Sequence, residues 1–284
     1  MGYKGAQQLP WGRSLAGELV ERVRKSGRFE EPILLGPRGV FEGLVNCEIV
    51  DVDANLMTTL GCAFELIRSR FKPESPTALS SCDILPAPGE FRLLLDTFYV
   101  PYRECMFWGQ MVEAQPSDLC ASAWKPSYRI RPNAGEPPKN LYPGHLFIFR
   151  TGALYPQLTL RILELMYRYR NRDIRKRPFR MIARGLGSLV VEDFRQLFSS
   201  EFPGLTVSIP YGVLRAYYRL RRQQVTLSDF ESVVAKCFVR SIFHRRAQGR
   251  PVVFAITRIL SFAKDIDTQA ELAEACVSSP CVSD

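Results

Sequence analysis

Histidine is scarce in this chain: only His145 and His244 occur among 284 residues. General acid–base catalysis most often uses histidine, so such chemistry would have to rest on carboxylates here. The sequence also lacks the GxxxxGK[ST], GxGxxG, HExxH and GxSxG patterns of phosphate loops, dinucleotide folds, zinc proteases and serine hydrolases. We therefore predict a protein without catalytic residues, without a cofactor and without a small-molecule substrate.

Long apolar runs and closely paired cysteines are missing as well. No run approaches the ~20 apolar residues that span a bilayer, and no apolar segment follows Lys4 as in a secretory signal. The eight cysteines form no CxxC pair, and only Cys276 and Cys281 come close together, in the tail. These absences predict an intracellular protein with reduced thiols, no transmembrane segment and no metal site.

Acidic residues are scarce in one part of the chain. Between Arg161 and Arg250 there are nineteen Lys or Arg against seven Asp or Glu, although the net charge of the whole chain is only +9. Seventeen of the nineteen are arginine, which binds phosphate oxygens bidentately and stacks on flat rings. This regional charge predicts a surface for a polyanion, either nucleic acid, ribonucleoprotein or anionic lipid. The alternative is an ordinary charged surface with scattered ion pairs.

The basic residues of this surface fall into three groups. On a helix after Pro156, four arginines lie at helical spacing within a sector of about 60°, and the group continues beyond that helix. The second group lies around Tyr217 and Tyr218, and the third surrounds His244. The predicted nucleic-acid-binding or lipid-binding residues are Arg161, Arg168, Arg172, Arg175, Lys176, Arg177, Arg180, Arg184, Arg215, Arg219, Arg221, Arg222, Arg245 and Arg246. The run from Arg172 to Arg177 also fits a nuclear import cluster.

Apolar spacing predicts an α+β fold, in which a mixed sheet is packed by amphipathic helices that are richer in the C-terminal half. Ser14 and Asp53 are expected to cap helices, and Pro210 to occupy the first turn of another. Capping boxes are expected at Ser228 with Glu231 and at Thr268 with Glu271. Residues 33–35, 91–95, 99–108, 146–149 and 252–256 are predicted strands.

Composition divides the chain into five stretches. Residues 1–13 are predicted to be a flexible arm, and residues 14–124 an N-terminal α+β region. A proline-rich irregular stretch covers residues 125–144. The basic α+β region covers residues 145–275, and residues 276–284 form a tail.

One short motif could bind a host protein. Tyr155, Pro156 and Leu158 match the YPxL peptide that budding viruses present to the host membrane-scission machinery. A helix that starts at Pro156 explains the same residues without such a role.

The segment around the basic helix resembles one known family. Lys176-Arg177-Pro178-Phe179, then Ile182-Ala183 and Leu186-Gly187-Ser188, is similar to a stretch of rhabdovirus matrix proteins. The resemblance covers residues 146–188, and the chain length is closer to that of the plant-infecting members. The PPxY peptide and the Lys-rich, Pro-rich tail of that family are missing. The resemblance implies a protein that condenses viral nucleocapsid, lines the inner face of the membrane and self-associates.

The sequence therefore predicts a non-enzymatic, matrix-like structural protein of a virion. Its partners would be viral ribonucleoprotein or other nucleic acid, or an anionic membrane surface, or both, together with further copies of itself. It would lie in the host nucleus or cytoplasm and at the membrane periphery. One alternative is a nucleic-acid-binding protein or a nuclease with a dispersed site, which would need carboxylates facing the basic surface. Another is an adaptor that binds acidic host proteins.

Overall fold

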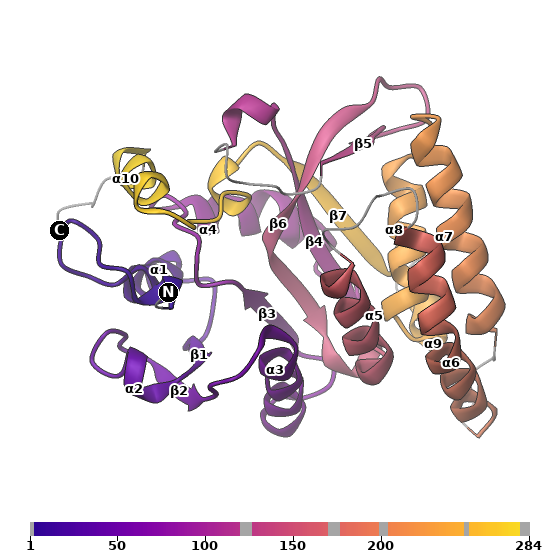
Figure 1. Cartoon of the computed structure of the whole chain (residues 1–284), viewed down its shortest axis with the longest axis horizontal. Helices are drawn as coiled ribbons and strands as arrows, with labels where there is room; N and C mark the ends of the chain where they lie inside the picture. The colour runs from indigo at the N-terminus through magenta and orange to yellow at the C-terminus, as the bar shows by residue number, and fades with distance from the viewer. Residues whose placement is uncertain (1–2, 120–126, 170–176, 199–203, 247–249, 279–284) are drawn as a thin grey trace.

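A five-stranded mixed sheet forms the centre of the computed structural model (Figure 1). The structure describes residues 3–119, 127–169, 177–198, 204–246 and 250–278. The strands run in the order β3 (Pro76–Ser80), β6 (Lys139–Arg150), β4 (Phe107–Glu113) and β7 (Val252–Thr257), and β5 (Tyr128–Ile130) pairs with β6. β4 and β7 are parallel and the other pairs are antiparallel. The predicted α+β fold with a mixed sheet is confirmed.

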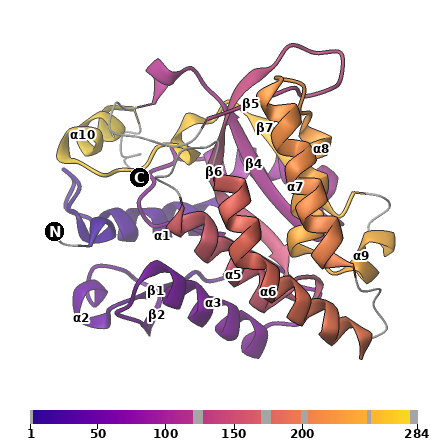
Figure 2. The ribbon, with the colours of Figure 1, turned by 45° about the vertical axis from the view of Figure 1, so that its right-hand side comes forward.

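Helices cover both faces of this sheet, because its central strand β4 is apolar on both sides. One face packs against α3 (Leu56–Arg70), α5 (Pro156–Arg168) and α8 (Leu227–Phe238), with α6 (Arg177–Leu197) and α7 (Leu205–Arg221) beside them (Figure 2). The other face packs against α1 (Leu15–Ser26) and α4 (Glu90–Leu94), around the fully buried Trp108. The helices are richer in the C-terminal half, as predicted.

The remaining elements are short. β1 (Ile33–Gly36) and β2 (Glu48–Asp51) form a separate parallel pair, joined through α2 (Arg38–Phe41). α9 (Ser241–Arg246) follows α8, and α10 (Gln269–Ser278) lies near the C-terminus. Single turns of 3-10 helix occur at η1 (Lys4–Ala6), η3 (Val100–Tyr102), η4 (Pro116–Asp118), η5 (Thr151–Ala153) and η6 (Leu260–Phe262), and η2 (Leu95–Tyr99) is a π-helical turn. In the described part of the chain, no helix combines the length and the apolar character needed to cross a bilayer.

The predicted helix caps are partly confirmed. Ser14 caps α1, where its hydroxyl accepts a hydrogen bond from the backbone N–H of Gly17 at 3.0 Å, and Thr268 forms the predicted capping box with Glu271. The Asp53 cap was wrong, because Asn55 caps α3. The Ser228–Glu231 box was also wrong: Thr226 and Asp229 form the box of α8.

Three further predictions are wrong. Of the strand predicted at residues 99–108, only Phe107 and Trp108 lie in a strand, because the preceding residues form the helical turns η2 and η3. Residues 91–95 are helical, because Phe91, Leu94 and Leu95 lie on one buried helical face and not on alternate sides of a strand. Pro210 lies inside α7, which already begins at Leu205.

Two stretches are more ordered than their composition suggests. β5 and the first half of β6 lie within residues 125–144, which were predicted to be irregular. The predicted N-terminal arm packs on the body of the protein, since Leu9 is buried and the Lys4 ammonium bonds to Asp267.

Candidate polyanion-binding surface

The band of four arginines predicted on one helix is not present in that form. α5 ends at Arg168, with Tyr169 as its C-cap. Glu164 forms ion pairs with the two arginines that α5 does carry, at 2.5 Å from Arg161 and 2.8 Å from Arg168. One carboxylate therefore partly neutralises both. Arg172, Arg175 and Lys176 lie outside the described residues.

Among the predicted arginines with described side chains, the exposed ones that form no ion pair with a described residue lie on α6 and on or directly after α7. Arg180 and Arg184 lie on α6, Arg215 and Arg221 on α7, and Arg222 follows directly as its C-cap. All five are exposed, and among the described residues none of them forms a salt bridge. The Arg184 guanidinium lies 5.7 Å from the centre of the Tyr169 ring.

The other predicted basic residues divide into two sets. Arg219 is half-buried and forms an ion pair with Asp229, so it contributes less free charge. Arg177 begins α6, and Arg245 and Arg246 end α9, but the positions of these three side chains lie outside the described part. None of the predicted arginines whose side chains are described is paired with an acid of the N-terminal half.

α6 and α7 form an antiparallel hairpin that is fixed at both ends. At one end the Asp193 carboxylate of α6 accepts hydrogen bonds of 2.7–2.8 Å from the backbone N–H groups of Gly204, Leu205 and Thr206, at the start of α7. At the other end the rings of Phe179 and Tyr217 lie 5.9 Å apart. Burial disfavours the charged form of Asp193, but these hydrogen bonds outweigh it and lower its pKa below the usual value. The charged carboxylate also suits the N-terminus of α7.

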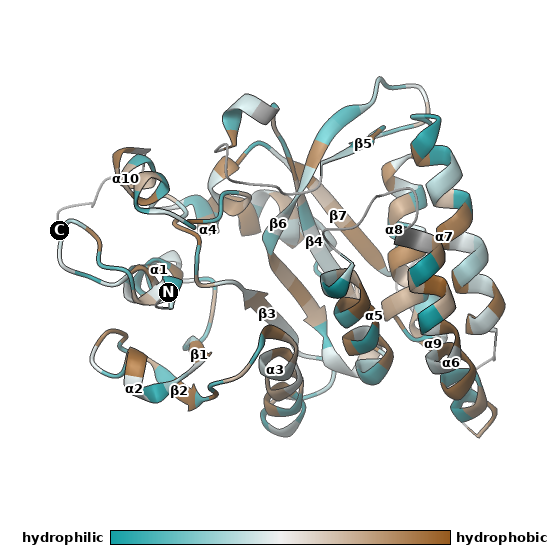
Figure 3. Cartoon of the chain, in the orientation of Figure 1, coloured by the Kyte–Doolittle hydropathy of each residue, from teal (hydrophilic) through white to brown (hydrophobic). Residues whose placement is uncertain are grey.

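The outer face of this hairpin is apolar. On α6, Leu186, Val190, Phe194 and Leu197 recur at steps of three and four residues, and between 42% and 62% of each is exposed. On α7, Val207, Tyr211 and Tyr218 are 74%, 62% and 56% exposed. Figure 3 shows the hydrophobic colouring of α6 at the edge of the molecule, beyond the helices that pack on the sheet. A contiguous apolar patch of this kind marks an interaction site.

The arginines border this apolar face on both sides. At about 100° per residue, Arg180 and Arg184 lie roughly 100–140° around α6 from Phe179, on the side away from α7. Around α7, Arg215 and Arg222 lie roughly 60–80° from Val207, on the side away from α6. We call these four arginines, together with the apolar residues of the previous paragraph, the α6–α7 surface.

The exposed apolar face was not found by sequence reasoning. An apolar stripe at helical spacing usually packs on the core, and α6 has such a stripe on its inner side at Leu189. The signal that could have revealed the second stripe is that α6 has apolar residues around most of its circumference. Only the packing shows which of them remain exposed.

The predicted host-factor motif lies in the core. Tyr155 and Leu158 are each only 3% exposed, and the Tyr155 hydroxyl accepts a hydrogen bond from Gln196 Nε2 at 2.9 Å. A peptide motif must be accessible to bind a partner, so the helix start at Pro156 is the better explanation of these residues.

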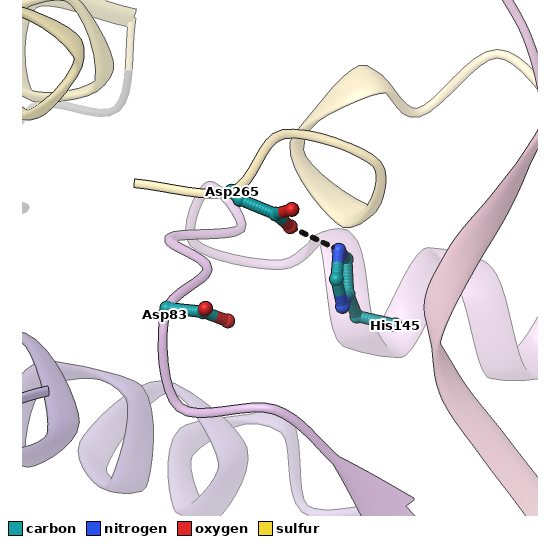
Figure 4. A group of neighbouring side chains, drawn as sticks. All are labelled: Asp83, His145 and Asp265. Carbon is teal, nitrogen blue, oxygen red and sulfur yellow. Dashed lines mark ion pairs between the residues drawn. The ribbon is translucent and has the colours of Figure 1, made fainter. Parts of the chain in front are cut away.

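A second group of side chains was also missed. Asp83, His145 and Asp265 place one ligand atom each within 4.8 Å of one another (Figure 4). The prediction of no metal site did not consider them together, because they come from three distant segments of the chain. They are also remote from the α6–α7 surface: Asp265 follows η6, whose Phe262 packs on the Trp108 face of the sheet. They therefore do not supply the carboxylates that a nuclease would need beside the arginines.

No protein-family model matches the chain, and no curated protein sequence matches it.

Proposed function

We propose that this protein is a non-enzymatic, matrix-like structural protein that docks on anionic membranes through the α6–α7 surface. One observation carries the proposal: exposed aliphatic and aromatic side chains lie between two rows of arginines that have no acidic partner within the described residues. Helices with an apolar face and flanking cations lie in the plane of a bilayer interface. There the apolar side chains enter the acyl boundary and the cations bind lipid headgroups.

The composition of the face favours lipid over nucleic acid. Single-stranded RNA is held by aromatic side chains that stack on bases, together with a basic groove. Leu186, Val190 and Leu197 can neither stack on a base nor form hydrogen bonds with it, yet they gain free energy on entering an apolar phase. Arginine side chains bind the phosphate groups of lipids and of RNA alike. The exposed aliphatic residues are therefore what favours lipid over RNA.

The resemblance to rhabdovirus matrix proteins supports the same assignment, because part of it, Phe179 and Leu186 to Ser188, lies on α6. In this proposal the protein lines the inner face of a membrane and self-associates there. Arginines that do not contact the bilayer bind viral ribonucleoprotein. These activities need no catalytic residues.

Vesicle flotation beside an RNA gel shift tests the proposal. The protein is expected to float with vesicles that contain phosphatidylserine and to stay at the bottom with neutral phosphatidylcholine vesicles, at about 150 mM salt. Raising the salt concentration should weaken flotation, because headgroup binding is electrostatic. RNA binding without flotation would contradict the membrane role and favour the nucleic-acid alternative.

A further inference from the structure

Asp83, His145 and Asp265 form a compact donor set (Figure 4). Their chain neighbours Ile84 and Leu146 pack with Trp108, on the side of the sheet away from the α6–α7 surface. Asp83 lies in the loop after β3, His145 within β6, and Asp265 between η6 and α10. The His145 Nε2 atom pairs with the Asp265 carboxylate, and the Asp83 carboxylate points toward the same space. Each side chain is partly shielded, with 20–23% of it exposed.

The backbone of β6 is distorted where it presents His145. Gly109 of β4 pairs with Phe147, but Met111 pairs with Pro143, so Gly144, His145 and Leu146 all lie opposite Gln110. Such a bulge redirects a side chain and is common beside functional sites. Gly144 makes the bulge possible, since a Cβ atom there would lie 2.2 Å from Gln110 Cγ.

The ring of His145 is held in the orientation that a metal ligand requires. The Ser81 hydroxyl lies 2.9 Å from Nδ1, which leaves Nε2 to face the Asp265 carboxylate. Metal-binding histidines typically use one ring nitrogen for the metal and the other for a hydrogen bond of this kind.

The charges around His145 favour a cation. The carboxylates of Asp83, Asp265 and Asp267 lie near Lys4, whose ammonium bonds to Asp267 and is 3.7 Å from Asp83 Oδ2. The single ammonium group of Lys4 thus faces three carboxylates. Asp83 Oδ1 is buried and has no hydrogen-bond partner in the described part of the chain, which is costly for a carboxylate oxygen.

We propose that Asp83, His145 and Asp265 bind one divalent transition-metal ion, such as Mn²⁺ or Zn²⁺. The ion takes the place of the proton between His145 Nε2 and Asp265, and Asp83 supplies the third donor. Donors at about 2.0–2.2 Å from an ion lie about 3.0–3.6 Å apart, so small side-chain rotations suffice to close the group. One imidazole and two carboxylates suit such ions. The bound ion would join the loop after β3, strand β6 and the segment before α10.

The neighbouring Cys82 is not part of this donor set. Its Sγ atom lies beside Gly5 and packs against the apolar cluster that contains Ala16 and Phe41, outside the group of the three donors. Mn²⁺ is therefore a suitable probe, because it prefers oxygen and nitrogen donors to sulfur. This proposal is independent of the membrane-docking role.

Titration of the chelator-treated full-length chain with Mn²⁺, followed by the electron paramagnetic resonance signal of the free ion, tests the proposal. The wild type is expected to bind one ion and to gain thermal stability from it. Asp83→Asn, Asp265→Asn and His145→Gln should each weaken binding by at least about tenfold, since each removes a ligand. Ser81→Ala should weaken it by about tenfold while one ion still binds, because Ser81 only positions the ring.

Asp267→Asn is the matched control, because it removes a carboxylate from the same neighbourhood but leaves the three donors intact. Because it removes one nearby negative charge but no ligand, it should weaken Mn²⁺ binding by no more than about threefold. The proposal is overturned if the wild type binds no ion at millimolar Mn²⁺, or if Asp267→Asn loses as much affinity as Asp83→Asn. It is also overturned if a fluorophosphonate labels Ser81 while no metal binds, since the same residues would then form a hydrolytic site.

Discussion

Replacing Arg180, Arg184, Arg215 and Arg222 with glutamate is expected to abolish binding to anionic vesicles without unfolding the protein. Each arginine near an anionic leaflet contributes about 1 kcal/mol, and a loss of about 4 kcal/mol corresponds to roughly a thousandfold weaker affinity. The four side chains are exposed and form no ion pair with any described residue, so their replacement should leave the fold intact. Vesicle cosedimentation measures the affinity and circular dichroism checks the fold.

A variant with the same net charge controls for nonspecific repulsion. The exposed arginines Arg68, Arg92, Arg103 and Arg129 lie on or directly after other elements, and their replacement with glutamate lowers the net charge by the same amount. We expect this control to keep most of its vesicle binding. If both variants lose vesicle binding equally, the net charge of the chain, and not the α6–α7 surface, is responsible for membrane binding.

Replacing Val190, Phe194 and Leu197 with serine is expected to weaken vesicle binding roughly a hundredfold. Each side chain is more than half exposed, and burying it in the bilayer contributes about 1 kcal/mol, or about half the value for full burial. The three changes leave the arginines in place. RNA binding should therefore be unaffected, and comparing vesicle cosedimentation with an RNA gel shift separates the two partners.

The chain offers a matched control for these apolar changes. Leu56, Leu93 and Val277 are 50%, 53% and 84% exposed but lie on α3, α4 and α10. Their replacement with serine should leave vesicle binding within about threefold of the wild type, as expected for surface sites. If the α6 variant binds vesicles as tightly as this control, the apolar face does not enter the bilayer. A shift from dimer to monomer in the α6 variant would show instead that a second copy covers the face.

The sequence predicted those parts of the fold that depend on local patterns. α1 is the clearest case: Ser14 and Gly27 enclose a helix whose apolar residues recur at helical spacing, and the left-handed conformation at Gly27 (φ 63°) ends it. The strand at 252–256 and the capping box at Thr268 were found for the same reason. The strand predicted at 91–95 failed because only tertiary packing distinguishes a short apolar helix from a strand.

The candidate surface was predicted by region but not by detail. The excess of arginine pointed to the C-terminal half, and α6 and α7 do present arginines there that form no ion pair with any described residue. The ion pairs of Glu164 with Arg161 and Arg168 were not predicted, because the sequence analysis considered the arginines of this helix and not Glu164 between them. The Asp83, His145 and Asp265 group could not be predicted, because the sheet and its bulge bring these residues together from distant parts of the chain.

Hydrogen–deuterium exchange of the wild type on vesicles tests the central claim most directly. When phosphatidylserine vesicles bind, backbone amides of α6 and α7 should exchange more slowly, while those of α3 and α10 should exchange as in the free protein. Neutral vesicles should cause no change. Protection that appears on α3 or α10 but not on α6 and α7 would contradict the proposed membrane surface.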